Sequence, residues 1–218
     1  GGGYGQKWGF YPEEILIPLL SILTQRPVKW VETRREHMVG TVHAREQTHT
    51  IEAAVRRDGK ILGIKDRIVA NIGVAYPTGG LASIVTTGMF VPGAYKIANY
   101  AGEVVGVATN KTPYGAHRGF GKSEACFVIE RLIDIIAERL EMDPTEIRFR
   151  NFIPPEDFPY ISVTGPRYDS GNYAAALRKA QNLAEYPRWR KEQQRLRQQG
   201  RYIGIGTCLV VEPSSSTR

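Results

Sequence analysis

The sequence lacks a long apolar run and has only two cysteines in 218 residues. Its most apolar stretch, residues 15–23, contains Pro18 and is shorter than the ~18–20 residues of a membrane-spanning helix. Cys126 and Cys208 are separated by 81 residues, which excludes a disulfide-dense secreted scaffold and a zinc or iron–sulfur site made of cysteine alone. We therefore expect no membrane span and a reducing, cytoplasmic location.

The chain also lacks an initiator methionine and the charged-then-apolar start of a signal peptide. It opens on three glycines instead, so we expect it to be a piece of a longer protein. Its composition, 42% hydrophobic and 23% charged, is that of an ordinary globular protein rather than a disordered one.

Positive charge is concentrated in one segment. Residues 187–201 carry +5 of the net charge of +7. A basic helix rich in glutamine is more often a solvated face or a subunit contact than a nucleic-acid surface, and Trp189 has no aromatic partner beside it for base stacking. We expect no nucleic-acid binding.

Hydrophobic periodicity predicts a mixed α/β (α+β) fold. Expected helices cover residues 12–24 with a kink or late start at Pro18, 123–141, a short stretch from 143, and about 169–199. Expected strands cover residues 28–32, 48–55, 61–70, 103–109 and 202–211. Asp58-Gly59 predicts a hairpin between two of these strands, and the Gly/Thr/Ser/Pro-rich residues 71–93 predict a long functional loop.

Two helix starts are predicted from capping residues. Asp143 is expected to cap the short helix, with Pro144 at its first position and Glu146 as the capping-box carboxylate. Asp169-Ser170 is expected to cap the last long helix.

Two glycine-rich turns, residues 1–7 and 115–121, are each followed by a helix start, where backbone N–H groups favour a phosphate or another oxyanion. Gln6 replaces the last glycine of a Walker loop, and Glu124 replaces the final glycine of the dinucleotide fingerprint. An ordinary kinase, GTPase or Rossmann dehydrogenase is therefore not expected. Such glycines can serve only tight turns, but two aromatic-bearing turns in one chain favour a cradle for an anion or cofactor.

Other chemistry is less well supported. His37, His43 and His49 are spaced by six, and on a continuous strand they would share a face suited to a metal. Gly40 and the absence of a nearby cysteine favour three unrelated histidines instead. No serine lies in a Gly-x-Ser-x-Gly elbow, and spacing identifies no acid–base pair.

Residues 1–7, Gly-Gly-Gly-Tyr-Gly-Gln-Lys, resemble the Gly-Gly-Gly-Phe-Gly-x-Lys segment of the xanthine oxidase family of molybdenum hydroxylases. Residues 116–121, Ala-His-Arg-Gly-Phe-Gly, resemble its Ala-Phe-Arg-Gly-Phe-Gly segment. The similarity covers nearly the whole chain and is greatest to the large subunit of aerobic carbon monoxide dehydrogenases. Further stretches that carry it are residues 27–32, 140–143, 150–153 and 168–173.

The resemblance implies an oxidoreductase that inserts water-derived oxygen into a C–H bond, or oxidises carbon monoxide, at molybdenum held by molybdopterin. In bacterial relatives the pterin usually carries a cytosine dinucleotide. Electrons leave through a small subunit with 2Fe-2S clusters to a medium subunit that binds FAD. The resemblance implies seven cofactor-binding residues. Near the metal it places Gly3, Tyr4 and Gly5, and beside the cofactor it places Arg118. On the substrate side it places Gly119, Phe120 and Gly121. Side chains of this chain are not expected to ligate the metal.

Three departures from the family bear on the substrate. Gly119 stands where copper–molybdenum enzymes have a cysteine, so copper and carbon monoxide oxidation are not expected. Trp8 and Thr86 stand where xanthine enzymes have a glutamate and an arginine, so purine hydroxylation is not expected. An aldehyde, a heteroaromatic compound or an unknown small molecule remains.

Large subunits of this family are several times longer than this chain. The resemblance places the general-base glutamate and a Gly-Gln-Gly loop beyond Arg218, so the fragment alone is expected to be inactive. Residues 1–164 are expected to form the first molybdopterin-binding domain, and residues 165–218 to begin the next part of the subunit. The alternative is a non-catalytic subunit-interaction or scaffold domain of the same ancestry.

Overall fold

The computed structural model describes residues 3–74 and 80–213. These residues form the predicted mixture of helices and strands, in two compact units. Unit 1 comprises Gly1–Thr50, Arg67–Gly88 and Glu103–Ser123, and unit 2 comprises Ile51–Asp66, Met89–Gly102 and Glu124–Arg218. The predicted domain boundary after residue 164 stays a prediction.

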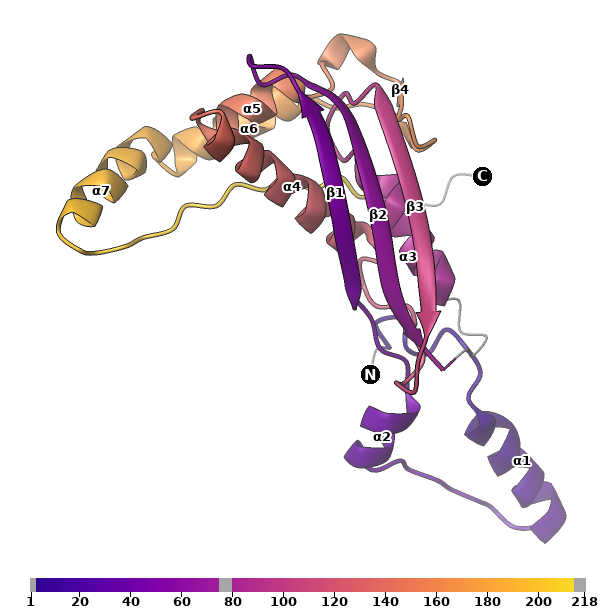
Figure 1. Cartoon of the computed structure of the whole chain (residues 1–218). Coiled ribbons are helices and arrows are strands. Elements are labelled where there is room, and N and C mark those ends of the chain that lie inside the picture. The colour runs from indigo at the N-terminus through magenta and orange to yellow at the C-terminus, as the bar shows by residue number, and fades with distance from the viewer. Residues whose placement is uncertain (1–2, 75–79, 214–218) are drawn as a thin grey trace. The chain divides into compact units, whose positions relative to one another are not determined.

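The main sheet has three strands, β1 (Gln47–Val55), β2 (Ile61–Gly73) and β3 (Asn99–Ala108), in the order β1-β2-β3 (Figure 1). β1 and β2 form the predicted hairpin, and in its turn the Gly59 N–H donates to the Arg56 carbonyl at 2.9 Å. β2 and β3 run parallel, since the Asn99 side chain donates to the Leu62 carbonyl and, further along both strands in the same direction, Arg67 pairs with Glu103. The three strands predicted here are confirmed.

A helix, α3 (Gly80–Phe90), connects β2 to β3. The prediction of a loop over residues 71–93 was therefore wrong for residues 71–73, which end β2, and for residues 80–90, while residues 75–79 lie outside the described residues. Ser, Thr and Gly disfavour helix, but burial overrides this propensity because Ile84 packs with Ile68, Ala70 and Tyr114 in the core of unit 1. Thr86 lies on this helix, and its hydroxyl donates to the Ala82 carbonyl at 2.8 Å.

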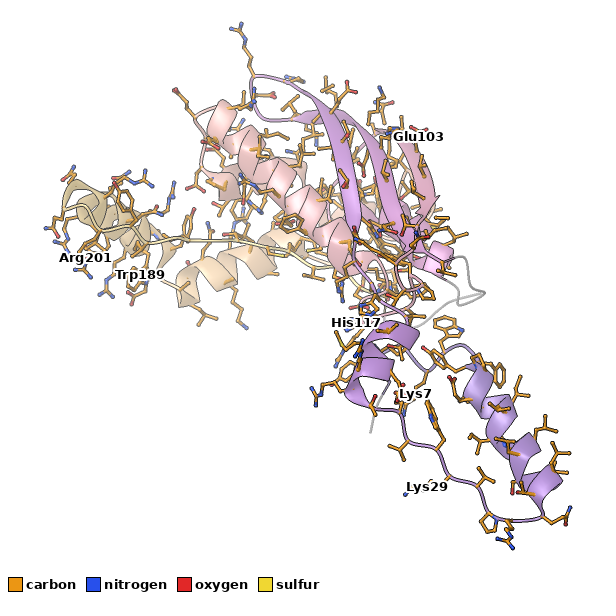
Figure 2. All side chains as sticks on the ribbon, turned by 60° about the horizontal axis from the view of Figure 1, so that its bottom comes forward. Lys7, Lys29, Glu103, His117, Trp189 and Arg201 are labelled. Carbon is orange, nitrogen blue, oxygen red and sulfur yellow. The ribbon has the colours of Figure 1, made fainter. Side chains whose placement is uncertain are left out.

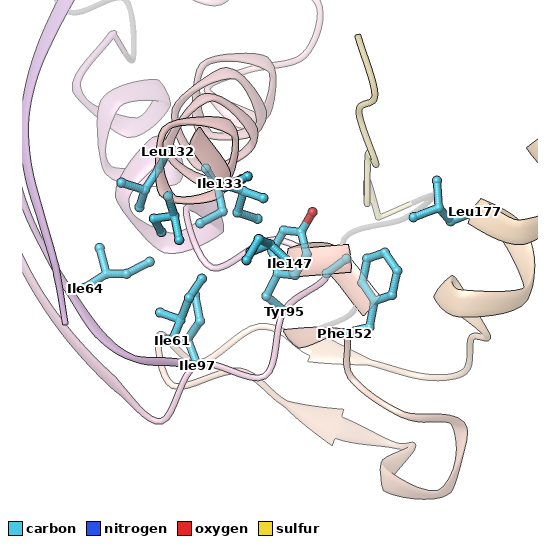
Figure 3. Packing of buried hydrophobic residues seen from close by; sticks show 13 residues of the cluster. Ile61, Ile64, Tyr95, Ile97, Leu132, Ile133, Ile147, Phe152 and Leu177 are labelled. Atoms are coloured by element: carbon cyan, nitrogen blue, oxygen red, sulfur yellow. The ribbon is translucent and has the colours of Figure 1, made fainter. Parts of the chain in front are cut away.

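The core of unit 2 is built on α4 (Lys122–Arg139) and α5 (Pro144–Asn151). The apolar spacing that predicted α4 places one face of this helix in the core, against residues of β2 and the segment before β3 (Figure 3). Its central buried side chains include Ile61, Ile64, Tyr95, Ile97, Ile129, Leu132, Ile133, Ile147 and Phe152.

A charged network crosses this apolar core. The Arg148 side chain is fully buried and pairs with Glu130 at 2.8 Å and with Asp134 at 2.9 Å. The Tyr95 hydroxyl donates to the other oxygen of Glu130, and an Arg148 nitrogen donates to the Thr207 carbonyl at 2.8 Å. Burial is the largest single effect on Arg148 and lowers its pKa, but the interactions with Glu130, Tyr95 and Asp134 together outweigh burial, so the net pKa is raised. Burial and the same carboxylate raise the pKa of Tyr95.

The predicted long helix over residues 169–199 was wrong as a single element. The chain forms α6 (Tyr173–Leu183) and α7 (Tyr186–Gln198), with Glu185 between them in the left-handed region at φ 49°. Pro187 lacks an N–H and its ring crowds the Leu183 carbonyl four residues earlier, which disfavours an uninterrupted helix at this point. Asn172, rather than Asp169, caps α6 by accepting from the Ala175 N–H at 2.9 Å.

Asp143 caps α5 as predicted, but Glu146 does not complete a capping box and pairs instead with Arg150. The predicted strands at 28–32 and 202–211 were also wrong, because neither segment pairs with a strand among the described residues. Both segments are extended but form no β-sheet hydrogen bonds with a described strand. The small elements are η1 (Pro155–Asp157) and the antiparallel pair β4 (Tyr160–Ile161) and β5 (Arg167–Tyr168).

In unit 1, α1 (Pro12–Thr24) and α2 (Arg34–Gly40) follow the first glycine-rich turn. The helix predicted over residues 12–24 is confirmed, and it continues through Pro18 rather than starting late. α1 has no fully buried residue, and most of its apolar side chains, including Ile15, Ile22 and Leu23, are exposed. Along the part of the chain that the structure describes, helices are too short or too polar to cross a membrane.

Much of the basic segment lies on α7, where Trp189 is half exposed; Trp189 and Arg201 mark the segment in Figure 2. Its charge is partly balanced locally, because Arg188 pairs with Glu185 and Arg195 pairs with Glu192. These pairings fit a solvated or subunit-facing surface better than a surface for phosphate groups.

Candidate cofactor site: two stacked glycine-rich loops

The two glycine-rich turns, far apart in sequence, come together in unit 1. We call residues 3–8 the first loop and residues 115–121 the second loop; Lys7 and His117 mark them in Figure 2. The Tyr4 ring stacks on the His117 ring with centroids 6.3 Å apart. The Trp8 ring stacks on the Phe120 ring with centroids 5.4 Å apart. All seven predicted site residues therefore lie on one pair of contacting loops, while Gly1 and Gly2 lie outside the described residues.

Glycine is required where the loops touch. Gly5 has φ 111°, and a Cβ there would lie 2.5 Å from the Ala116 carbonyl oxygen. Gly121 has φ 85°, and a Cβ there would lie 2.1 Å from the Ser83 carbonyl oxygen of α3. A side chain at Gly5 would push the two loops apart, and a side chain at Gly121 would push the second loop away from α3.

Both loops also hold an aromatic residue in the left-handed region, Tyr4 at φ 53° and Phe120 at φ 47°. Such conformations cost about 1–3 kcal/mol each and persist only where the surroundings impose them, most often at functional sites. Here the two ring stacks supply part of that constraint. The left-handed backbones and the close glycine contacts together indicate that the conformation of the loop pair is fixed before any ligand binds.

The loops offer unused hydrogen-bond donors. Within residues 3–74 and 80–213, the backbone N–H groups of Tyr4, Gly5, Gly119 and Gly121 donate no hydrogen bond. The Arg118 side chain is exposed and makes no ion pair with a described residue. The second loop leads directly into the N-terminus of α4, whose dipole favours negative charge. Backbone donors and a guanidinium together fit the phosphate and oxo groups of a pterin cofactor.

Arg45 holds the second loop in place, and the sequence analysis missed it. Its guanidinium bonds the Ser123 hydroxyl, the His117 ring at 3.0 Å and the Arg118 carbonyl. Its own backbone has φ 85°, and its N–H donates to the Tyr114 hydroxyl at 3.0 Å. No motif surrounds Arg45, so its role follows only from the folded chain.

Replacing Arg45 with glutamine is expected to loosen the second loop. Losing charge-assisted hydrogen bonds worth about 1.5–3 kcal/mol should raise amide hydrogen exchange across residues 117–123 by about tenfold or more. Lys111→Gln is the control, because it breaks an exposed ion pair with Glu46 in the same unit. Equal exchange of the second loop in the two variants would show that Arg45 does not order it.

The three predicted candidate histidines do not share a site. His37 pairs with Glu32 at 2.6 Å, the His43 ring meets the Met38 carbonyl at 3.2 Å, and the His49 ring meets the Gln47 amide at 3.2 Å. Among the residues that the structure describes, no group of three potential metal-ligating side chains occurs.

A cleft of about 1070 Å³ adjoins the first loop. Gln6, Lys7 and Tyr11 line it together with Trp30 and His37, and its walls are mainly apolar. The second loop does not line this cleft. The first loop therefore contributes both to the cleft and to the loop pair, whereas the second loop contributes to the loop pair alone.

Comparison with known proteins agrees with this geometry. Residues 1–152 match the family model of the molybdopterin cofactor-binding domain. The chain is 43% identical over 197 residues to the carbon monoxide dehydrogenase large chain of Hydrogenophaga pseudoflava, covering 88% of this chain and 24% of that one. It is 35% identical over 222 residues to the nicotine 6-hydroxylase large subunit of Paenarthrobacter nicotinovorans, covering 100% of this chain and 27% of that one.

The solved structure of quinoline 2-oxidoreductase from Pseudomonas putida 86 superposes with a TM-score of 0.85 at 35% identity, over 92% of this chain and 26% of that one. The chain thus spans about a quarter of the length of the relatives it matches. The resemblance to large subunits of molybdenum hydroxylases and the predicted fold are confirmed. With its two stacked loops inside the matched region, the chain belongs to the molybdopterin cofactor-binding domain family.

Proposed function

We propose that this chain is the molybdopterin-binding part of the large subunit of a molybdenum hydroxylase. The observation that carries the proposal is the loop pair, which carries the exposed Arg118 side chain and four backbone N–H groups that donate no hydrogen bond to a described residue. These groups only donate hydrogen bonds, so they suit the oxyanions of a molybdopterin rather than a cationic or apolar ligand.

Each predicted site residue has a role in this proposal. Gly3, Tyr4 and Gly5 approach the metal end of the cofactor through backbone amides. Arg118 holds an anionic group of the cofactor with a permanently charged, forked donor. The remaining residues, Gly119, Phe120 and Gly121, shape the substrate side.

When bound, molybdopterin supplies the molybdenum chemistry that oxidises a C–H bond with water as the source of oxygen. The residues of this chain bind and orient the cofactor, and the stacked rings of Phe120 and Trp8 present an apolar surface beside the loop donors. Proton abstraction is assigned to a glutamate in the remaining part of the large subunit, so the 218 residues alone are expected to be inactive.

The substrate class follows from the second loop and from the relatives. Gly119 provides no thiolate for copper, which argues against carbon monoxide. Two of the relatives are named for nicotine and quinoline, and both names denote nitrogen heteroaromatics. We therefore favour hydroxylation of a small heteroaromatic compound, with an aldehyde as the second choice.

The complete enzyme in this proposal contains a medium subunit with FAD and a small subunit with 2Fe-2S clusters. Its pterin carries a cytosine dinucleotide, and the complex is cytoplasmic. A non-catalytic scaffold domain of the same ancestry is the alternative, and the exposed apolar side chains of α1 are the observation that favours a docking role.

Arg118→Ala in the complete enzyme tests the proposal. Loss of charge-assisted hydrogen bonds worth about 1.5–3 kcal/mol should weaken cofactor retention by about 10- to 100-fold. Molybdenum and pterin are measured per large subunit in the purified protein. Arg131→Ala, which removes the same charge from an exposed position on α4, should leave both contents unchanged.

Two results would contradict the proposal. Equal molybdenum content in Arg118→Ala and Arg131→Ala would remove Arg118 from the cofactor site. Wild-type enzyme free of molybdenum and pterin, under conditions that load other members of the family, would favour the scaffold alternative.

A further inference from the structure

The only two cysteines of the chain lie side by side in unit 2, although 81 residues separate them in sequence. Their sulfur atoms are 3.3 Å apart, and both are free thiols. Cys126 is half-buried in the first turns of α4, and Cys208 is exposed on the extended residues 201–213, which we call the C-terminal segment. The contact therefore joins a helix of the core to an extended segment that forms no strand pairing with a described residue.

Neighbouring contacts hold Cys208 in this position. The carbonyl of Thr207, just before it, accepts a hydrogen bond from the buried Arg148 at 2.8 Å. The carbonyl of Leu209, just after it, faces the Cys126 sulfur at 3.8 Å. Leu209 and Val211 pack against the core of unit 2, so alternate residues of the segment face inward. These contacts on both sides place Cys208 beside Cys126.

We infer that Cys126 and Cys208 form a redox-sensitive cross-linking site, in which a hydroperoxide converts the two thiols to a disulfide between α4 and the C-terminal segment. A disulfide has an S–S length of about 2.05 Å, so the sulfurs need to approach by only about 1.3 Å from their 3.3 Å separation. The exposed segment that carries Cys208 can make this movement more readily than α4.

The chemistry runs in two steps. The hydroperoxide first oxidises the exposed Cys208 thiol to a sulfenic acid, and its remaining oxygen leaves as an alcohol or as water. The Cys126 sulfur then attacks the Cys208 sulfur, forming the S–S bond, while the Cys126 proton and the displaced hydroxide leave together as water. Excess dithiol reductant returns both cysteines to thiols.

The order of the steps follows from the surroundings of each thiol. Burial raises the pKa of Cys126 to about 12, and its hydrogen bond with Cys208 adds to this effect. Cys126 is therefore almost fully protonated and half shielded, which makes it a poor first target for an oxidant. Cys208 is reached first, and Cys126 then resolves its oxidised form.

Peptide mapping of the full-length protein tests the inference. The reduced protein is treated with hydrogen peroxide, remaining thiols are blocked with iodoacetamide, and trypsin releases residues 123–131 and 202–218, each with a single cysteine. We expect mass spectrometry to find these two peptides linked in most of the protein, and to find them separate after dithiothreitol.

Two variants make the result specific. Cys126→Ser should abolish the link and leave Cys208 as a sulfenic acid that dimedone labels. Cys208→Ser should leave Cys126 a free thiol under the same treatment. Iodoacetamide labelling of both cysteines in peroxide-treated wild type, or preferential oxidation of Cys126 in Cys208→Ser, would overturn the inference. The readout is independent of molybdenum content, so it neither needs nor tests the proposed function.

Discussion

Replacing Arg148 with alanine is expected to lower the free energy of unfolding by about 3–5 kcal/mol. The substitution removes a fully buried cation and leaves the Glu130 carboxylate buried without its partner. It also removes the donors to Asp134 and to the Thr207 carbonyl. A loss of this size is a large fraction of the roughly 5–15 kcal/mol that stabilises an ordinary domain.

Arg150→Ala is the matched control, because Arg150 lies on the same helix but makes its contacts, with Glu146 and the Asp58 carbonyl, at the exposed surface. Exposed pairs contribute about 0–1 kcal/mol, so this variant should unfold at nearly the wild-type urea concentration. Urea denaturation followed by tryptophan fluorescence and circular dichroism measures both variants. Similar losses for Arg148→Ala and Arg150→Ala would mean that the buried network contributes little to stability.

Gly5→Ala is expected to separate the two glycine-rich loops and to lower the molybdenum content at least as much as Arg118→Ala. The new Cβ would lie 2.5 Å from the Ala116 carbonyl oxygen, at a backbone φ of 111°. Strain and steric overlap together should destabilise the loop pair by about 2–4 kcal/mol. The measurements are molybdenum per large subunit and hydrogen exchange in residues 115–121.

Gly165→Ala, between β4 and β5 in unit 2, is the control for backbone strain without overlap and outside the loop pair. Gly165 has a similar φ of 104°, but a Cβ there meets nothing within 4 Å, so this variant carries the backbone strain without the overlap. We expect a loss of about 1 kcal/mol and full molybdenum content. If Gly5→Ala retains its molybdenum as well, close contact between the loops is not needed for cofactor binding.

Features encoded by local patterns were predictable from the sequence. The Asp58-Gly59 turn, the periodic apolar face of α4 and the Asp143 cap depend on residues within a few positions of one another. The two loops could be predicted as well, from their glycines and from their resemblance to a known family. What each loop touches could not be predicted, because stacking of Tyr4 on His117 depends on the path of the chain between them.

The failed predictions share this cause. α3 is helical because Ile84 finds a core formed by residues far away in sequence, although its own composition favours a loop. The apolar alternation at 202–211 does mark an extended segment, but a strand also needs a partner, which the alternation cannot indicate. Arg45 acts through a left-handed backbone that only the surrounding fold imposes on a non-glycine residue.

The exposure of α1 has a consequence for how the cofactor site becomes ordered. A helix of 13 residues without a fully buried side chain gains little free energy from packing, and helices of this length are marginal in water by themselves. Folding of α1 should therefore be coupled to docking of its apolar side chains on the remainder of the proposed large subunit. The Tyr11 hydroxyl, just before α1, donates to the Gln6 carbonyl of the first loop at 2.8 Å. Assembly of the subunit would then rigidify the cofactor loop through its neighbouring helix, making cofactor loading a late event in maturation.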